Sequence, residues 1–373
     1  MVKKKTAILI PDAENYLLIH VLNCLAQIDT VTIYAMTVKH NWATYSRHIK
    51  KNTVFSEASN GLKRIESINA ELLKHDIDII MPIHDACIKD LIIYREHLIN
   101  HEKIIVLPSY DVYKIVTNKG KFSAHLETYG IPAPKSGVLK TESLQEYKRF
   151  GLSFPFIIKP ASNSHGGLGV VLIDSEMALQ SYRDTYREFD EFVVQEYIEG
   201  DDWGCSVLCV AGELKAYSLQ RTTIHEKKPF SPAIGVELVH DTRPLEMVKQ
   251  LLRSLSWNGV AHIDMRYNLA TNSFVIIEMN ARYWASIEAS MVGGINFPYL
   301  HLLLSMGKDF PLPTYRSIEY LKLKGVLYRL KKDRWSVFDF RFLRSNTELG
   351  AVCRDVMPSL FRMFSSIKKQ LKG

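Results

Sequence analysis

Two carboxylates and an amide are spaced in the sequence so that they could hold a metal ion. Strand alternation puts His262, Asp264 and Arg266 on one face of a predicted strand, and Glu278 and Asn280 share a side of the next one. Asp264, Glu278 and Asn280 can therefore converge across a hairpin. Their oxygens are hard ligands that suit Mg²⁺, whose remaining ligands are water or phosphate oxygens. An equally weighted interpretation is that the carboxylates simply pair with Arg266 and Arg282.

A lysine at the end of an apolar strand supplies a second feature. Lys159 must reach either an anion or solvent, because an unpaired charge is costly to bury. The segment 162–169 follows it and contains Gly166, Gly167 and Gly169. Such a flexible flap could cradle phosphate oxygens with its backbone N–H groups. A glycine-rich hairpin is more often a plain turn, so that interpretation also stands.

An acidic turn after another apolar strand supplies a third feature. The strand that begins at Phe192 continues into Glu196, Tyr197 and Ile198, and Asp202 follows a glycine turn. This hinge could present backbone groups to an adenine and a carboxylate to a ribose. Taken alone, it is an ordinary acidic turn.

The elements that must position these residues begin with an open α/β domain. Its predicted strands and helices are 6–10, 16–27, 31–35, 77–83, 88–98 and 103–107. The first turn lacks the glycines that let a backbone approach pyrophosphate, which argues against NAD or FAD. His84 and Asp85 follow the strand 77–83, where ligands bind in open α/β sheets, so both are substrate candidates. Helix capping by Asp85 is an equal alternative.

The chain of 373 residues is longer than one core usually supports, so several packed units are expected. We predict an N-terminal α/β domain at 1–110, a lid with an entry helix at 111–200, and a catalytic unit at 201–315. The fold class is thus α/β combined with α+β. Residues 316–373 form a basic extension that ends in an amphipathic helix. This helix is expected to dock on the body or a partner, with weaker membrane-surface contact as the alternative.

Composition excludes several classes of protein. The five cysteines are scattered without C-x-x-C spacing, which argues against structural zinc and a disulfide framework. The formal charge of +7 is moderate and lies mostly at 3–5 and beyond 320, so phosphate ligands and solvated tails explain it better than nucleic acid. No uncharged apolar run approaches the roughly 20 residues that a membrane span needs. A cytoplasmic protein without a transmembrane segment is therefore expected.

Taken in order, these segments resemble the ATP-grasp superfamily. The nearest likeness is to the large subunit of carbamoyl-phosphate synthase, with kinship to biotin carboxylase and D-alanine:D-alanine ligase. The chain is too short to hold both synthetase halves of the former, so carbamoyl phosphate is not the expected product. The resemblance covers about 1–310 and is carried by Asn118-Lys119, IIKP at 157–160, the glycine flap, EYIEG at 196–200, HID at 262–264 and EMNAR at 278–282.

The resemblance implies an ATP-grasp fold, with a Rossmann-like N-terminal domain and ATP held between lid and catalytic unit. It also implies a role for each matching residue. Lys119 and Lys159 would contact phosphates beneath the flap glycines, Glu196, Tyr197 and Ile198 would hold adenine, and Asp202 would hold ribose. Asp264, Glu278 and Asn280 would bind Mg²⁺ or Mn²⁺, and Arg282 would stabilise the transferred phosphoryl group. His262 stands where the family often has arginine, and Arg221 is either a further substrate contact or a surface arginine.

The function implied is that of an ATP-dependent ligase. It would activate a small-molecule carboxylate as an acyl phosphate and join it to an amine, releasing ADP and phosphate. Phosphoryl transfer depends mainly on positioning and charge neutralisation, which the cations and Mg²⁺ would supply. The alternative is an ATP-binding regulatory protein without turnover. A homodimer is an open option, and nucleic acid is not an expected partner.

Overall fold

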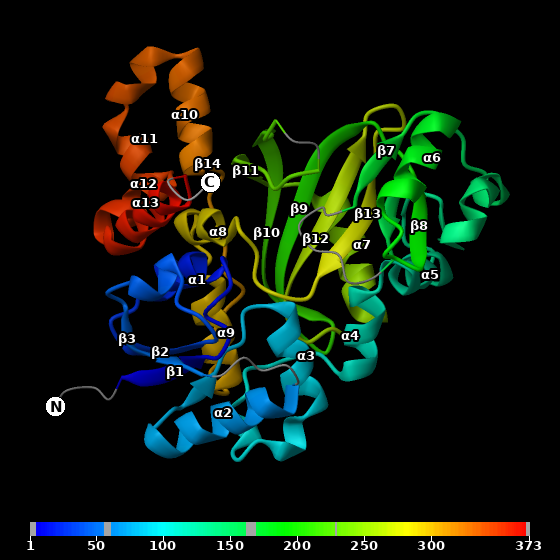
Figure 1. Ribbon diagram of the computed structural model, residues 1–373. Coiled ribbons are helices and arrows are strands. Elements are labelled where there is room, and N and C mark those ends of the chain that lie inside the picture. Colours follow the sequence, from blue (N-terminus) through cyan, green and yellow to red (C-terminus); the bar gives the residue numbers. More distant parts are fainter. Residues whose placement is uncertain (1–4, 56–60, 162–168, 228–229, 371–373) are drawn as a thin grey trace.

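The computed structural model describes residues 5–55, 61–161, 169–227 and 230–370, with side chains described up to 363. Three β-sheets organise this part of the chain, and helices cover their faces (Figure 1). The glycines Gly166 and Gly167 of the expected flap lie outside the described residues.

The N-terminal sheet is parallel and has the order β3-β2-β1-β4. Its strands are β1 (Thr6–Ile10), β2 (Val31–Thr37), β3 (Ile49–Val54) and β4 (Ile79–Ile80). The buried side chains of β1 alternate between two cores, because successive residues of a strand face opposite ways. Ile8 and Ile10 pack with α1 (Leu18–Leu25), whereas Leu9 packs with α2 (Gly61–Lys74) and α3 (Asp85–Ile93).

The strand expected at 103–107 is wrong. A 3-10 turn, η3 (His101–Lys103), occupies the start of this segment. Another 3-10 turn, η2 (Arg95–His97), precedes it. Only Ile104 bridges to the sheet, at Ile80. The backbone of Val106 is instead used by a helix, since its N–H donates to Ser305 and its carbonyl accepts from the ring of His301. The segment therefore ties the N-terminal domain to the rest of the molecule.

The second sheet is antiparallel, with the order β5-β8-β6-β7. It is preceded by two helices where the sequence predicted one. The helices end and begin at Asn118, whose side chain caps the second helix by accepting from Lys121 N–H. The elements are α4 (Tyr110–Thr117), α5 (Lys119–Thr128), β5 (Ser136–Lys140), η4 (Thr141–Phe150), β6 (Phe156–Pro160), β7 (Val171–Ile173), α6 (Glu176–Thr185) and β8 (Glu191–Glu196).

The third sheet is the largest and is antiparallel, with the order β13-β12-β9-β10-β11-β14. One face packs on α7, and the other shares a core with α1, α8 and α9. The sheet is thereby fastened to the N-terminal domain (Figure 1). Its elements are β9 (Gly200–Val210), β10 (Glu213–Ile224), β11 (Gly235–Val239), α7 (Thr242–Ser254), β12 (Gly259–Asn268), β13 (Ser273–Asn280), α8 (Ile287–Gly293), α9 (Phe297–Ser305) and β14 (Glu319–Leu321).

A β-bulge in β13 changes which residues face the core. Asp264 pairs with Glu278 and Met265 pairs with Ile276, so Ile277 is an extra residue in β13. Before it, even-numbered residues such as Ile276 are buried; after it, the odd-numbered Met279 is buried. The bulge thus turns Glu278 out of the core and to the same side as Asp264. The division of the chain into four domains at the expected boundaries stays a prediction.

The C-terminal extension is helical. It contains α10 (Leu323–Lys332), η5 (Arg334–Phe338), α11 (Phe340–Ser345), α12 (Glu348–Arg354) and α13 (Met357–Gln370). The start of α13 docks on η1 (Trp42–Tyr45), where Phe361 stacks on Tyr45 with ring centroids 3.6 Å apart. None of the helices in the described part of the chain combines the length and apolar composition needed to cross a membrane.

The carboxyl group of Asp12 makes stability depend on pH. Burial, with help from Glu14, raises its pKa to about 7, although it accepts hydrogen bonds from Ile83 and His84 N–H. Because the folded-state pKa exceeds the unfolded one, its stabilising contribution is complete below about pH 4 and is lost as pH rises to about 7. We expect Asp12→Asn to gain stability over the parent between about pH 5 and pH 8, by a few kcal/mol.

Thermal or urea unfolding of both proteins across this range measures the effect as a difference. The exposed Asp29→Asn variant is the matched control and should show a constant difference from the parent. A constant difference for Asp12→Asn as well would mean that Asp12 is ionised in the folded protein throughout.

Candidate active site

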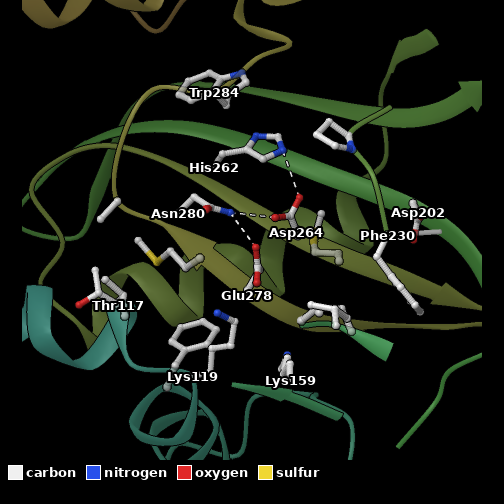
Figure 2. Close-up of a pocket in the computed structure, with 18 of the residues that line it drawn as sticks. Thr117, Lys119, Lys159, Asp202, Phe230, His262, Asp264, Glu278, Asn280 and Trp284 are labelled. Carbon is white, nitrogen blue, oxygen red and sulfur yellow. Dashed lines mark hydrogen bonds and ion pairs between the residues drawn. The ribbon is translucent and has the colours of Figure 1, made fainter. Parts of the chain in front are cut away.

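A cavity of about 1390 Å³ lies between the second and third sheets and reaches the N-terminal domain. Lys119 and Lys159 enter it from α5 and β6, and the polar residues of β12 and β13 face them (Figure 2). Its other end is lined by Asp85 and Lys89 of α3. The cavity is therefore bounded by all three sheet-containing parts of the chain.

The ammonium group of Lys159 is buried and hydrogen-bonded to a neighbouring strand. Its side chain is 4% exposed, and Nζ donates a 3.0 Å hydrogen bond to Oε1 of Gln195 on the neighbouring strand β8. Burial lowers the pKa of Lys159 to about 8, partly offset by the charge of Glu278. A cation held in this way is poised to gain from an anion entering the cavity.

Asp264 and Glu278 form a carboxylate pair joined by one amide. Asn280 Nδ2 donates to Asp264 Oδ2 at 2.9 Å and to Glu278 Oε1 at 3.1 Å. Burial in the cleft raises the pKa of Asp264, and Glu278 adds to this. For Glu278 the same burial is outweighed by Lys119 and Lys159, so its pKa is lowered. The ionised form of Glu278 is therefore favoured, and its side chain points toward the two lysines (Figure 2).

Arg282 extends this polar cluster toward the N-terminal domain. Its Nε donates to Asp85 Oδ2 at 2.9 Å, and Nη2 donates to Asn280 Oδ1 at 3.1 Å. The guanidinium plane is thereby fixed beside the carboxylate pair. Arg266 pairs instead with Asp202 at 2.8 Å. Both arginines thus have carboxylate partners other than Asp264 and Glu278. This differs from the alternative considered for the hairpin, in which Asp264 and Glu278 pair with Arg266 and Arg282.

His262 is held from three sides. Its Nδ1 lies 3.0 Å from Ser206 Oγ, its Nε2 lies 3.4 Å from Asp264 Oδ1, and its ring stacks on Trp284. The neighbouring strand makes room for the ring with a glycine, because a Cβ on Gly204 would lie 2.7 Å from His262 Cε1. The imidazole therefore lies between the hairpin that carries the candidate metal ligands and the Trp284 ring on the cavity wall.

Gly204→Ala should displace the His262 ring. We expect a loss of about 1–3 kcal/mol in the free energy of unfolding, because the added methyl overpacks a buried contact. In a His262→Ala background the same substitution should be nearly neutral, since the clashing ring is gone. Urea unfolding of the four proteins measures the coupling. Equal costs in both backgrounds would show that the clash is relieved elsewhere.

The residues expected to hold adenine and ribose line the same cavity. Glu196 ends β8, Tyr197 and Ile198 follow it, and Asp202 lies in β9. Glu196 is fixed by Lys135, whose N–H donates to its Oε2 at 3.1 Å. Gly169 also lines the cavity with φ of +72°, a conformation that favours glycine.

Two expected substrate residues are not brought to the cavity. Arg221 pairs with Glu237 on the face of β10 opposite to Gln220 and Thr222, which do line it. Strand alternation explains this placement. His84 is absent from the cavity lining, whereas Asp85 reaches it at the first turn of α3.

Sequence reasoning missed several residues that the structure places here. Gln195 carried a weak signal, as a polar residue in an otherwise apolar strand. Trp284 lies two residues after the EMNAR segment and could have been found by extending it. Ser206 and Lys322 gave no local signal, because they reach the site through cross-strand pairing and through the approach of β14.

Comparison with known proteins supports the likeness seen in the motifs. Residues 188–325 match the family model described as ATP-grasp in the biosynthetic pathway with Ter operon. D-aspartate ligase of Enterococcus faecium is 25% identical over 209 residues, which are 50% of this chain and 49% of that enzyme. The carbamoyl phosphate synthase large chain of Thermoplasma volcanium is 22% identical over 271 residues, 69% of this chain and 24% of that protein. The chain thus spans about half of one relative and a quarter of the other.

The fold agrees with these matches. The crystal structure of L-amino acid ligase from Bacillus licheniformis superposes with a TM-score of 0.62 at 16% identity, covering 82% of this chain and 74% of that one. The chain has the ATP-grasp fold, and its residues 188–325 match an ATP-grasp family. Its ATP-grasp fold, and the mixed α/β and α+β class, confirm the fold predicted from sequence.

The donor set of this ATP-grasp chain fits Mg²⁺ and a triphosphate. Two carboxylates that share one amide donor offer oxygen ligands, and the Asn280 amide donates a hydrogen bond to each of them. Turning that amide would present its oxygen instead. Lys119 and Lys159 face these ligands across the cavity, so a phosphate chain bound there would lie between opposite charges (Figure 2).

Proposed function

We propose that the chain is an ATP-dependent carboxylate–amine ligase that activates its carboxylate as an acyl phosphate. The observation that carries the proposal is the placement, in one cavity, of two lysines opposite two carboxylates bridged by Asn280. This is a place for a metal-bound phosphate chain between opposite charges. A bound Mg²⁺ would neutralise phosphate charge there, with Asp264, Glu278 and Asn280 as its protein ligands.

The remaining roles follow from charge and position. Lys159 and Lys119 hold the phosphate chain, and Glu196 to Ile198 with Asp202 hold the nucleoside end. Arg282 supplies a fixed positive charge between the phosphate end and the N-terminal domain. That position suits the carboxylate substrate and the acyl phosphate formed from it, since preorganised cations stabilise charge that develops during transfer. His262, hydrogen-bonded to Ser206, limits the site on its other side.

Amino acids are the substrate class that we propose to test first. The relatives named D-aspartate ligase and L-amino acid ligase act within this class by name. An amino acid also offers both charges that the N-terminal end of the cavity can pair. Arg282 and Lys89 suit its carboxylate, and Asp85 suits its ammonium group.

The test is MgATP-dependent ADP release with pools of amino acids and other carboxylates, with hydroxylamine added to trap acyl phosphate. Substrate-dependent ADP together with a hydroxamate is the expected result, and the hydroxamate identifies the activated carboxylate. Binding of MgATP without ADP release on any pool would contradict the ligase proposal. That outcome would favour the regulatory protein.

A further inference from the structure

The C-terminal extension contains a helical hairpin that the proposed ligase site does not use. We call residues 323–345 the C-terminal hairpin; it comprises α10, η5 and α11. It stands apart from the three sheets at the upper left of Figure 1. Arg329 joins its two arms, because the guanidinium lies 4.3 Å from the centre of the Phe342 ring.

Large apolar side chains are exposed on this hairpin. Trp335, Phe338 and Phe340 are 78%, 61% and 69% exposed, and their rings follow one another at 5.8 Å and 6.4 Å. Leu327 and Val337 are also exposed. Contiguous exposed apolar groups of this kind mark an interaction surface, because they gain nothing from the fold itself.

The same hairpin carries most of the excess charge of the chain. It contains seven basic and two acidic residues, against a net charge of +7 for all 373 residues. Both acidic residues, Asp333 and Asp339, cap helical turns by accepting backbone N–H groups. Within the part of the chain that the structure describes, the ion pairs of the hairpin are those of Lys324 and Arg329, near its base. Lys332 lies over the Tyr328 ring, with Nζ 4.7 Å from the ring centre, and its charge is not offset by that contact. The cations beside the aromatic groups can therefore meet an anionic partner.

We propose that the C-terminal hairpin binds the surface of anionic lipid bilayers. Tryptophan and phenylalanine flanked by lysine and arginine suit the interfacial layer, where rings enter the acyl boundary and cations meet headgroups. A second copy of the chain would bring like charges face to face. Nucleic acid would use rings as stacking platforms, but the aliphatic Leu327 and Val337 cannot stack on bases. The protein would then lie on the membrane without crossing it.

The first measurement uses the full chain in vesicle flotation. Vesicles of phosphatidylcholine alone are compared with vesicles that also contain phosphatidylglycerol. We expect at least about tenfold stronger partitioning to the anionic vesicles, and a loss of most of that binding at high salt. Equal partitioning to both, or none to either, would overturn the proposal.

Matched variants localise the binding. Trp335→Ser with Phe338→Ser and Phe340→Ser should reduce partitioning at least about tenfold. The control is Leu73→Ser with Met177→Ser, which removes side chains that are 79% and 82% exposed elsewhere and should change nothing. Similarly, Lys331→Glu with Lys332→Glu and Arg334→Glu should abolish the lipid preference. The exposed control set, Lys140→Glu with Lys148→Glu and Lys308→Glu, should not. Unfolding and MgATP binding of each variant establish that the fold is kept.

Fluorescence gives an independent readout. The other four tryptophans are buried or half-buried, so a blue shift on adding anionic vesicles should come from Trp335 and vanish in Trp335→Phe. Binding that the hairpin variants leave unchanged would contradict the assignment. A dimer lost in the serine variant would identify the surface as a contact between copies, and oligonucleotide binding lost in the glutamate variant would identify nucleic acid; either would replace the lipid proposal.

Discussion

Glu278→Gln is expected to lower turnover by about a thousandfold or more, with little effect on the fold. The substitution removes one of two carboxylates from the proposed metal site, and loss of a preorganised charge contact of this kind costs about 4 kcal/mol in the transition state. Glutamine is isosteric and its amide oxygen can still accept the 3.1 Å hydrogen bond from Asn280. Steady-state ADP release and thermal unfolding measure the two effects separately.

The control for this prediction is Glu213→Gln. Glu213 is exposed and pairs with Arg253 on the far side of the third sheet, so the same chemical change should leave turnover intact. The Mg²⁺ concentration that gives half of the maximal rate should also rise in Glu278→Gln. Retained turnover with an unchanged Mg²⁺ requirement would show that Glu278 is not a metal ligand.

Lys159→Met should abolish tight nucleotide binding and at the same time stabilise the empty protein. The lowered pKa of about 8 means that the fold disfavours the charged lysine, so a fitting apolar side chain removes that cost. We expect ATP affinity to fall about a hundredfold, because a buried cation no longer meets the phosphates. Stability at neutral pH should rise by about 1–2 kcal/mol, after allowance for the lost hydrogen bond to Gln195.

The variant is informative because ATP affinity is expected to fall while stability is expected to rise. Isothermal titration with MgATP measures the affinity, and urea unfolding without ligand measures the free energy of unfolding. Lys140→Met, at the exposed end of β5, is the matched control and should change neither. A Lys159→Met protein that is less stable, with unchanged ATP affinity, would make Lys159 a structural residue.

Strand periodicity predicted part of this site well. His262, Asp264 and Arg266 alternate with buried neighbours, and all three line the cavity. Period-two alternation is local, so it can be read from the sequence. The pairing of Arg282 with Asp85 could not be predicted from the sequence, because it joins residues 197 positions apart. Whether each residue has its expected role stays a prediction until the variants are measured.

Where local signals misled, tertiary contacts are the cause. Arg221 ends an apolar strand much as Lys159 does, yet β10 continues and turns its side chain outward to Glu237. The strand expected at 103–107 has strand-like composition, but α9 takes its hydrogen-bonding groups. Short strands such as β14 carry too few residues to show periodicity and exist only through pairing with β11.

The extra residue at Ile277 bears on how this hairpin can change in evolution. It switches the buried parity of β13, so removing it would turn Glu278 and Asn280 toward the core and Met279 away from it. Length changes in the exposed turn 269–272 leave that parity untouched. Lineages that keep the chemistry should therefore collect insertions and deletions in the turn, and almost none between Ile276 and Glu278.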